Sequence, residues 1–256
     1  MAPPTLASVM TPSLLSTIRN HPTLPPHGWY IVAASALTIL NRPDEVAKVW
    51  SFAIEDGSHG VKHEPDQERQ RRITRRIREA LIKTSAVGGV PKTINSLLSL
   101  KQVTPPELID EPGSPSPTGR LRDLYDVPAS EVLRRGQSFF EKVYGKIAKR
   151  IMGQMDRSGT EDLGLTARLV YGHVLSNISI LSPIETSFVM IAGLIPQDVN
   201  PQLKGHLRGA LNGGATVEEV RAVREVAMQI CEASGMQRLA EDAVGGWGWR
   251  TEVANV

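Results

Sequence analysis

Residues 181–220 read LSPIETSFVMIAGLIPQDVNPQLKGHLRGALNGGATVEEV, and this stretch contains the start and stop signals of consecutive helices. Ser182 and Thr216 are each followed by a glutamate three residues later, which is the capping-box pattern of a helix start. Proline follows Ser182 at the first helical position, where its missing N–H is no loss. The NGG run at 212–214 tolerates positive φ and so ends a helix. These signals predict helices over 183–194, 200–212 and 217–233.

The rest of the chain continues this helical pattern, and the predicted fold class is all-α. Ile73, Ile77 and Leu81 fall four residues apart and form one apolar stripe, as on an amphipathic helix. No segment of the sequence shows the sustained alternation of apolar and polar residues that half-buried strands require. Further helices are predicted over residues 11–20, 27–40, 44–55, 67–85, 91–100, 129–144, 146–155, 160–175 and 236–244.

A proline-rich segment divides the chain. Five prolines fall between residues 103 and 119, together with glycine and serine, and this composition predicts an extended linker. Trp247 and Trp249 stand in a glycine-rich tail, where large apolar side chains need a surface to dock on, either the protein's own body or a neighbouring subunit. The predicted units are an N-terminal repeat over 1–102, the linker over 103–119, a C-terminal repeat over 120–244 and the tail over 245–256.

The two halves are predicted to be tandem repeats of one helical unit. A shift of 157 residues places Pro26 on Pro183 and Ala53 on Ala210, so that a buried helix followed by an amphipathic one recurs. Past residues 59–70 the shift falls to 146, which indicates an insertion in the first half. A duplicated unit is the economical explanation of this pattern.

Composition excludes several classes of protein. The 256 residues carry a net charge of only +2, which is too small for a field that would gather nucleic acid. No apolar run reaches the ~18 residues that suggest a membrane span. Cys231 is the only cysteine, which excludes a disulfide within the chain, a Cys-rich zinc site and a CxxC redox pair. The sequence therefore predicts no nucleic-acid partner, no membrane partner and no metal.

The arginine-rich run from Arg69 to Arg78 is a local exception to this charge balance. Its helix also carries an apolar stripe, so the arginines are expected to form the solvated face, with Glu68 and Glu79 as partners. No aromatic residues interleave with them for base stacking, and nucleic-acid binding is therefore not predicted here either.

The ends of the sequence favour the cytoplasm and leave mitochondria or peroxisomes open. The first 43 residues contain no acidic residue, as in a mitochondrial transit peptide, but Arg19 is the only lysine or arginine before Arg42. Residues 254–256 are not an SKL-type peroxisomal signal.

Three motifs within residues 181–220 together resemble the carboxymuconolactone decarboxylase-like family of the AhpD-like superfamily. They are the Ser-Pro helix start at Ser182, a Q-L-x-x-H-x-x-x-A-L-N-x-G helix from Gln202, and a G-A-T-x-E-E-V helix start from Gly214. A weaker resemblance covers residues 28–100 and points to the two-repeat fungal members, some of them peroxisomal. The resemblance implies an AhpD-like bundle of two repeats, assembly into homo-oligomers, and chemistry without a cofactor.

The chain departs from this family at the positions that carry thiol chemistry. Superfamily peroxidases use a CxxC pair before the helical histidine and a glutamate on the preceding helix. Here Val199 and Gln202 stand at the cysteine positions and Ser187 at the glutamate position, after Thr186 where many decarboxylase members carry arginine. Thiol peroxidase activity is therefore not expected, and decarboxylase chemistry is supported in part.

His206 is the predicted catalytic residue, because it stands at the family histidine and an imidazole can transfer protons near neutral pH. A buried histidine bonded to a backbone carbonyl is the alternative. Glu185 is the second catalytic candidate, as a carboxylate partner of His206. Its alternative role is that of the capping glutamate for Ser182.

Four further residues are candidates for the substrate-binding pocket. Tyr171 and His173 precede the matched region and could close over His206, and Arg208 could stabilise an enolate. Cys231 lies toward the end of a helix, where the helix dipole disfavours a thiolate. This cysteine is therefore expected to line the pocket or pack in the core, and not to react.

Two functions remain open on these residues. The first is a cofactor-free enzyme acting on a small-molecule substrate such as a lactone or a β-keto acid, with His206 as proton shuttle. The second is a non-catalytic oligomeric scaffold or ligand-binding protein that kept the fold and lost the reactive thiols. Val49 stands where His206 would map in the first half, so the site is expected in the second half.

Overall fold

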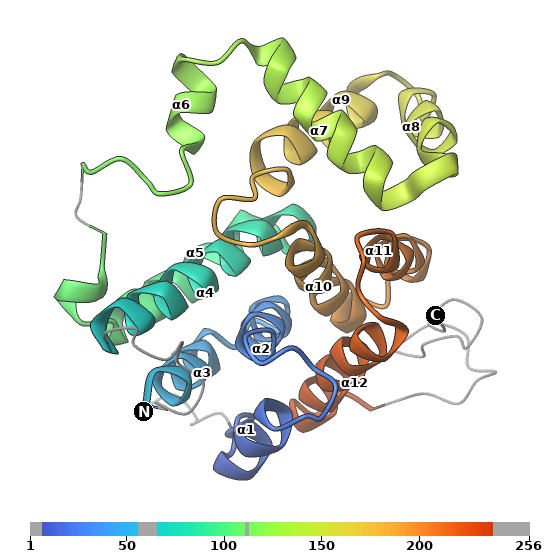
Figure 1. Ribbon diagram of the computed structural model, residues 1–256. Coiled ribbons are helices and arrows are strands. Elements are labelled where there is room, and N and C mark those ends of the chain that lie inside the picture. Colours follow the sequence, from blue (N-terminus) through green and yellow to red (C-terminus); the bar gives the residue numbers. More distant parts are fainter. Residues whose placement is uncertain (1–6, 56–65, 111–112, 238–256) are drawn as a thin grey trace, which may run out of the picture.

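In the computed structural model the described residues are 7–55, 66–110 and 113–237. Within these segments the chain forms helices and no β-strand, which confirms the all-α prediction (Figure 1). None of the described helices combines the length and the apolar composition needed to cross a bilayer.

The structure consists of α-helices, a π-helix and short 3₁₀ turns. The α-helices are α1 (Pro12–Arg19), α2 (Trp29–Ile39), α3 (Pro43–Glu55), α4 (Asp66–Gly88), α5 (Val90–Val103), α6 (Arg120–Tyr125), α7 (Ala129–Tyr144), α8 (Ala148–Asp156), α9 (Asp162–Leu169), α10 (Pro183–Leu194), α11 (Asn200–Asn212) and α12 (Val217–Ala233). The π-helix covers Val170–Leu175, and the 3₁₀ turns cover Pro106–Leu108, Gly145–Ile147 and Ile195–Gln197.

Helices with strong local signals have the predicted bounds. This holds for α7, α10, α11 and α12. Capping boxes explain where α10 and α12 begin, because the hydroxyls of Ser182 and Thr216 each accept a hydrogen bond from the backbone N–H of the glutamate three residues later. Two features were not predicted: the six-residue helix α6, and the change from α-helix to π-helix at Val170.

Most of the predicted helix over 236–244 lies outside the described residues, as does the whole tail with Trp247 and Trp249. The proline-rich segment is largely described, and between α5 and α6 it contains the 3₁₀ turn at Pro106–Leu108. The division of the chain into two units and a linker stays a prediction.

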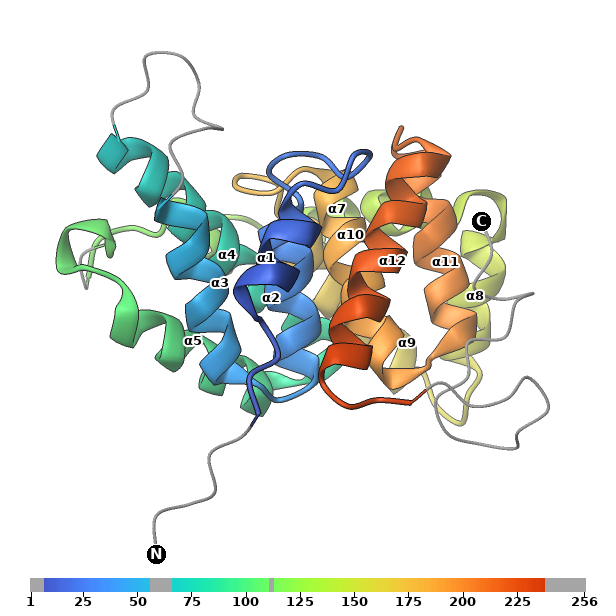
Figure 2. The ribbon, with the colours of Figure 1, turned by 90° about the horizontal axis from the view of Figure 1, so that it is seen from below.

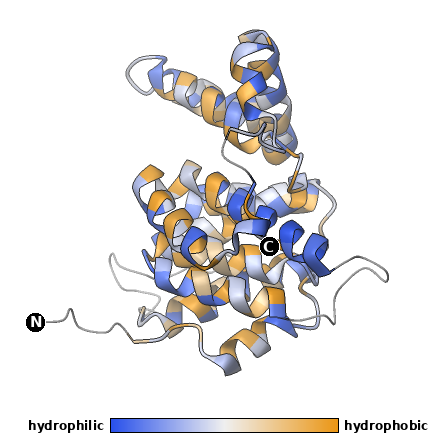
Figure 3. Ribbon diagram, turned by 90° about the vertical axis from the view of Figure 1, so that its left-hand side faces the viewer, coloured by the Kyte–Doolittle hydropathy of each residue, from blue (hydrophilic) through white to orange (hydrophobic). Residues whose placement is uncertain are grey.

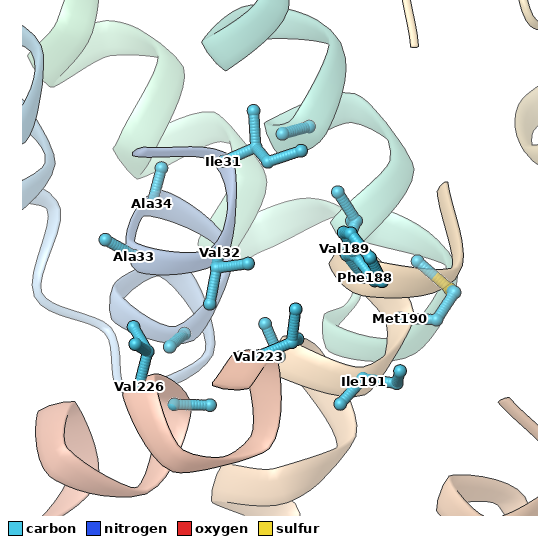
Figure 4. Packing of buried hydrophobic residues seen from close by; sticks show 14 of the residues in the cluster. Ile31, Val32, Ala33, Ala34, Phe188, Val189, Met190, Ile191, Val223 and Val226 are labelled. Atoms are coloured by element: carbon cyan, nitrogen blue, oxygen red, sulfur yellow. The ribbon is translucent and has the colours of Figure 1, made fainter. Parts of the chain in front are cut away.

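The core is built around two helices that are apolar on every side. All eleven residues of α2 are buried, and so is α10 from Thr186 to Leu194. A helix without a polar face needs neighbours all around it, and α10 accordingly packs against α2, α4, α11 and α12. Figure 4 shows Val32 of α2 and Phe188 of α10 with Val223 of α12 in this core. Helices from both sides of the proline-rich segment therefore share one core (Figure 2).

Helices α7, α8 and α9 form a smaller group above this body. They contact one another and the π-helix, and they meet the body mainly where α7 packs on α11 and the π-helix on α4. Figure 3 shows hydrophobic and hydrophilic residues alternating along these helices, as expected for amphipathic helices that cover one side of a core. The junction of this group with α10 and α11 positions the candidate site.

Candidate functional site

The candidate site is a cavity of about 320 Å³ bordered by α7, α10 and α11. It lies where the last turns of α7 and α11 meet the first turns of α10. Its wall combines apolar side chains with one lysine, one hydroxyl and one amide: Phe139, Lys142, Val143, Pro183, Ser187, Gly209, Asn212 and Gly213. The Asn212 amide donates a hydrogen bond of 3.2 Å to the Val143 carbonyl and so ties α11 to α7.

His206 lies on α11 one turn before Gly209. His206 is only 4% exposed, and its Nδ1 has no hydrogen-bond partner among the described residues. Burial lowers the pKa of His206 from 6.5 to about 4, so the ring is neutral at physiological pH. Buried polar atoms are nearly always hydrogen-bonded. The unpaired nitrogen therefore offers a position where a ligand could bind.

An aromatic cluster from α7 and the π-helix contacts this imidazole through Tyr144. The Tyr144 ring meets the His206 ring edge-on, with 6.0 Å between centroids. The Tyr171 hydroxyl donates to the Tyr144 hydroxyl at 3.4 Å, and Phe140 packs on both tyrosine rings. Burial raises the pKa of Tyr144, and it raises the pKa of Tyr171 well above 10. Both phenols are therefore protonated and can act as hydrogen-bond donors.

Glycines bring these elements into close contact. A Cβ on Gly205 would stand 2.5 Å from the Tyr144 ring, and one on Gly209 would stand 2.7 Å from the Val143 side chain. Two turns earlier on α7, a Cβ on Gly136 would stand 2.5 Å from the backbone nitrogen of Gly172 in the π-helix. Helix α7 can therefore lie against both α11 and the π-helix only while these positions lack side chains.

Glu185 has the capping role that was the alternative to a catalytic one, and its side chain faces away from the cavity. Its Oε2 accepts the Ser182 N–H at 2.9 Å, and its Oε1 accepts a hydrogen bond from Arg76 of α4. At ~100° per residue its side chain leaves α10 on the side opposite to Pro183 and Ser187, which line the cavity. Burial alone would raise the pKa of Glu185, but the hydrogen bond and charge of Arg76 outweigh burial and lower it.

None of the four candidate pocket residues lines the cavity, although Tyr171 is linked to His206 through Tyr144. Arg208 is exposed, because it stands two residues from His206 and so on the outer side of α11. His173 is half-buried two residues after Tyr171, and its carbonyl accepts a hydrogen bond of 3.0 Å from Arg120. Cys231 is buried in α12, where burial raises the pKa of its thiol to about 12.

The arginines of α4 form the predicted solvated face only in part. Arg78 is exposed, and Arg71 pairs with Glu68 at 2.7 Å as expected, but other arginines of this helix are enclosed. Arg69 is only 5% exposed, and the guanidinium of Arg76 bonds Glu185 and the Tyr30 hydroxyl. Glu79 does not pair with an arginine of its own helix but with Arg120. These arginines hold other helices in place, which leaves no basic stripe of the kind that nucleic acids require.

Sequence reasoning missed Tyr144 and Phe140. Their spacing on the predicted helix over 129–144 was the available signal, because residues four apart share a face. The imidazole and the two phenols form a buried cluster, while the Ser187 hydroxyl belongs to the wall of the neighbouring cavity, which His206, Tyr144 and Tyr171 do not line. All these groups can exchange hydrogen bonds or protons with an oxygenated molecule. Within residues 7–55, 66–110 and 113–237, no three His, Cys, Asp or Glu side chains converge as a metal site.

Comparison with known proteins gives relatives over most of the chain. Peroxisomal protein 2 of Schizosaccharomyces pombe is 38% identical over 219 residues, which cover 86% of this chain and 92% of that protein. Peroxisomal protein 2 of Saccharomyces cerevisiae is 32% identical over 266 residues, which cover 87% of this chain and 94% of that protein. No family model matches the chain. The chain belongs to the family of these peroxisomal proteins, the peroxisomal protein 2 family.

Proposed function

We propose that the protein is a cofactor-free enzyme of the carboxymuconolactone decarboxylase-like type that acts on a small oxygenated metabolite beside His206. The observation that carries this proposal is the buried, unpaired Nδ1 of that residue. A polar atom desolvated without a partner is costly, and a functional group awaiting its ligand is one explanation for it. The neighbouring cavity of about 320 Å³ falls within the range of small-molecule sites, ~300–1,000 Å³.

In this proposal His206 transfers the proton and the phenols stabilise charge. A ligand with a negative charge near the ring raises the pKa of His206 toward neutrality, where an imidazole is an effective acid and base. Tyr144 can donate to an oxyanion while Tyr171 donates to Tyr144. Lys142 in the cavity wall supplies a positive charge for a carboxylate. Tyr144 and Lys142 thus take the role first expected of Arg208.

The recurrence of helix bounds supports an AhpD-like fold of two repeats. Helices α3 and α11 both have 13 residues and are related by the shift of 157 that aligns the halves. Each follows a helix that is buried nearly all around, α2 in the first half and α10 in the second. The first repeat carries Val49 at the position of His206, so the proposed activity belongs to the second repeat.

His206→Gln is expected to abolish turnover while the protein stays folded. Removing a positioned acid and base costs ~10²–10⁴-fold in rate, and glutamine keeps a polar side chain of similar size. The measurement is consumption of a panel of lactones and β-keto acids, followed by proton NMR, with the melting temperature of each variant.

Arg208→Gln is the matched control, because it changes an exposed residue of the same helix. It is expected to retain wild-type turnover. Equal turnover in wild type and His206→Gln would contradict the proposal, and so would the absence of both turnover and binding across the panel in wild type.

A second candidate function is ligand binding without catalysis. It is favoured by the location of the charged candidates, since Glu185 is bound to Arg76 and Arg208 is exposed. One experiment distinguishes the enzyme from the binding protein. If the protein only binds, adding a compound of the panel shifts the protein's NMR resonances or its melting temperature, and the compound itself stays unchanged.

The peroxisome is the proposed location. Both relatives are named as peroxisomal proteins, and their alignments cover most of this chain. Their names state no activity, so this support concerns the compartment alone. The sequence by itself favoured the cytoplasm and left the mitochondrion open as well.

Homo-oligomers are proposed as well, through the exposed apolar face of α5. Val90, Ile94 and Leu98 stand four residues apart and are 61%, 48% and 55% exposed. Ile94→Glu is therefore expected to reduce the molar mass measured by light scattering to that of one chain, because it places a charge in an apolar contact. Asn95→Glu changes an exposed residue of the same helix about 100° around from Ile94, and so serves as control. Unchanged mass in Ile94→Glu would show that α5 is not the contact.

A further inference from the structure

The π-helix Val170–Leu175 carries Tyr171, and its end is held by charged residues from outside the site. Single π-helical turns are rare and often stand at functional sites. The carbonyls at a helix end have no partner within the helix and need donors from elsewhere. Here the donors come from Lys83 of α4 and Arg120 of α6.

These two cations bind four carbonyls within residues 173–177. Lys83 is fully buried, and its Nζ donates to the carbonyls of Leu175 at 2.8 Å and Asn177 at 2.7 Å. Arg120 donates through Nε to the His173 carbonyl at 3.0 Å and through Nη2 to the Val174 carbonyl at 3.1 Å. The negative end of a helix favours cations at this position.

Glu79 joins the two cations. It is 3% exposed, accepts a hydrogen bond of 2.7 Å from Arg120 Nη1, and lies 3.7 Å from Lys83 Nζ. Glu79 and Arg120 are the charged groups that face Lys83, and the π-helix presents only carbonyls to it. The two cations and one carboxylate of this cluster therefore carry one net positive charge. This charge lies next to the carbonyls at the end of the π-helix.

Burying the charge of Lys83 has a cost. Burial lowers the pKa of Lys83 from 10.5 to about 8. The unfolded chain therefore holds this proton more tightly than the folded protein does, and the buried charge lowers stability at neutral pH. An apolar side chain would avoid the cost of burying this charge, but it would leave the Leu175 and Asn177 carbonyls without the Lys83 donor. A role in fixing the geometry of the turn accounts for a lysine here.

We propose that Lys83 and Arg120 are positioning residues that fix the π-helix, and with it Tyr171, against Tyr144 at the candidate site. Lys83 belongs to the half of the chain that lacks the histidine, so this half sets the geometry of the site in the other half. The consequence for catalysis rests on the proposed function, whereas the positioning itself does not.

The first test is amide hydrogen exchange of the full chain, with Lys83→Met compared with wild type. Protection of residues 170–178 is expected to fall at least tenfold at pH 7, while protection of α2 stays within twofold. Nitration by tetranitromethane, located by mass spectrometry, is expected to rise at Tyr171. Tyr125, which is 74% exposed, reports the reagent's activity in both proteins.

Two controls separate positioning from general damage. Lys92→Met removes a lysine that donates to one carbonyl, that of Ile39, and is expected to leave residues 170–178 unchanged. In wild type, protection of this segment is expected to rise between pH 8 and pH 10, because the closed cluster binds the Lys83 proton less tightly than an opened, hydrated one. Lys83→Met is expected to lack that rise.

A milder pair of variants covers the case in which Lys83→Met does not fold. Arg120→Met is expected to lose protection of residues 170–178, and Arg120→Lys, which keeps the charge, to retain most of it. Wild-type protection of this segment in Lys83→Met or in Arg120→Met would overturn the proposal. Exchange and nitration need no substrate, so a protein without turnover could still pass this test.

Discussion

Glu185→Gln is expected to lower the free energy of unfolding by about 3 kcal/mol, because it leaves the buried guanidinium of Arg76 without its counter-charge. Breaking a buried ion pair from one side costs ~3–5 kcal/mol. We take the lower end because the Glu185 and Arg76 side chains are 22% and 12% exposed. Glutamine can still serve as the third residue of a capping box, so the cap at Ser182 is retained. Urea denaturation measures the difference.

The same substitution at the other capping box is the matched control. Glu219 caps Thr216 through a 2.8 Å hydrogen bond, and no ion pair with it is found among the described residues. Glu219→Gln is expected to change stability by less than ~0.5 kcal/mol, as surface substitutions usually do. If both variants lose the same stability, the effect belongs to the caps and not to the Arg76 pair. If Glu185→Gln also keeps full turnover per folded molecule, the carboxylate has no catalytic role.

Acidification from pH 6.5 to pH 4 is expected to remove about 3 kcal/mol of stability through His206 alone. Its pKa falls from 6.5 to about 4 on burial, and each unit corresponds to ~1.4 kcal/mol. Between these values the unfolded chain binds a proton that the folded protein does not, so the free energy of unfolding falls as the pH falls. Above pH 6.5 the ring is neutral in both states, and the contribution is fully present.

The measurement compares wild type with His206→Leu by urea denaturation at several pH values. Lowered carboxylate pKa values, such as those of Asp123 and Glu185, weaken both proteins in acid, so only the difference between them reports on His206. That difference is expected to change by about 3 kcal/mol in favour of His206→Leu from pH 6.5 to pH 4. A ligand bound at Nδ1 with negative charge would shift the wild-type transition to higher pH. Parallel curves for the two proteins would show that His206 is not buried.

The local features of the fold were predictable because their causes lie within a few residues. The bounds of α10 and α12 follow from Ser182 and Thr216, each with its glutamate three residues on. The central place of α2 follows from a run of apolar residues with no polar face. The turn at Val170 was missed because the change from α-helix to π-helix depends on donors from other helices.

The candidate site was predictable in part. The motif around His206 located the helix and the imidazole, and Tyr171 is linked to that imidazole through Tyr144, which the sequence reasoning did not name. Glu185 was ambiguous in the sequence, since the same glutamate could cap its helix or face a cavity. The structure decided for the cap and added Arg76, which is 109 positions away. No sequence spacing encodes that pairing.

Residue order alone specified the helices, their caps and the lack of a thiol pair, since propensity, periodicity and capping act over one or two turns. Packing decided which polar groups meet. A helix places neighbouring side chains about 100° apart, so the orientation of each helix in the core decides which of its residues are buried. In α10 this orientation directs Glu185 toward α4, and in α11 it exposes Arg208 and encloses His206. Such contacts depend on how whole helices fit together, and that fit is a property of the assembled core.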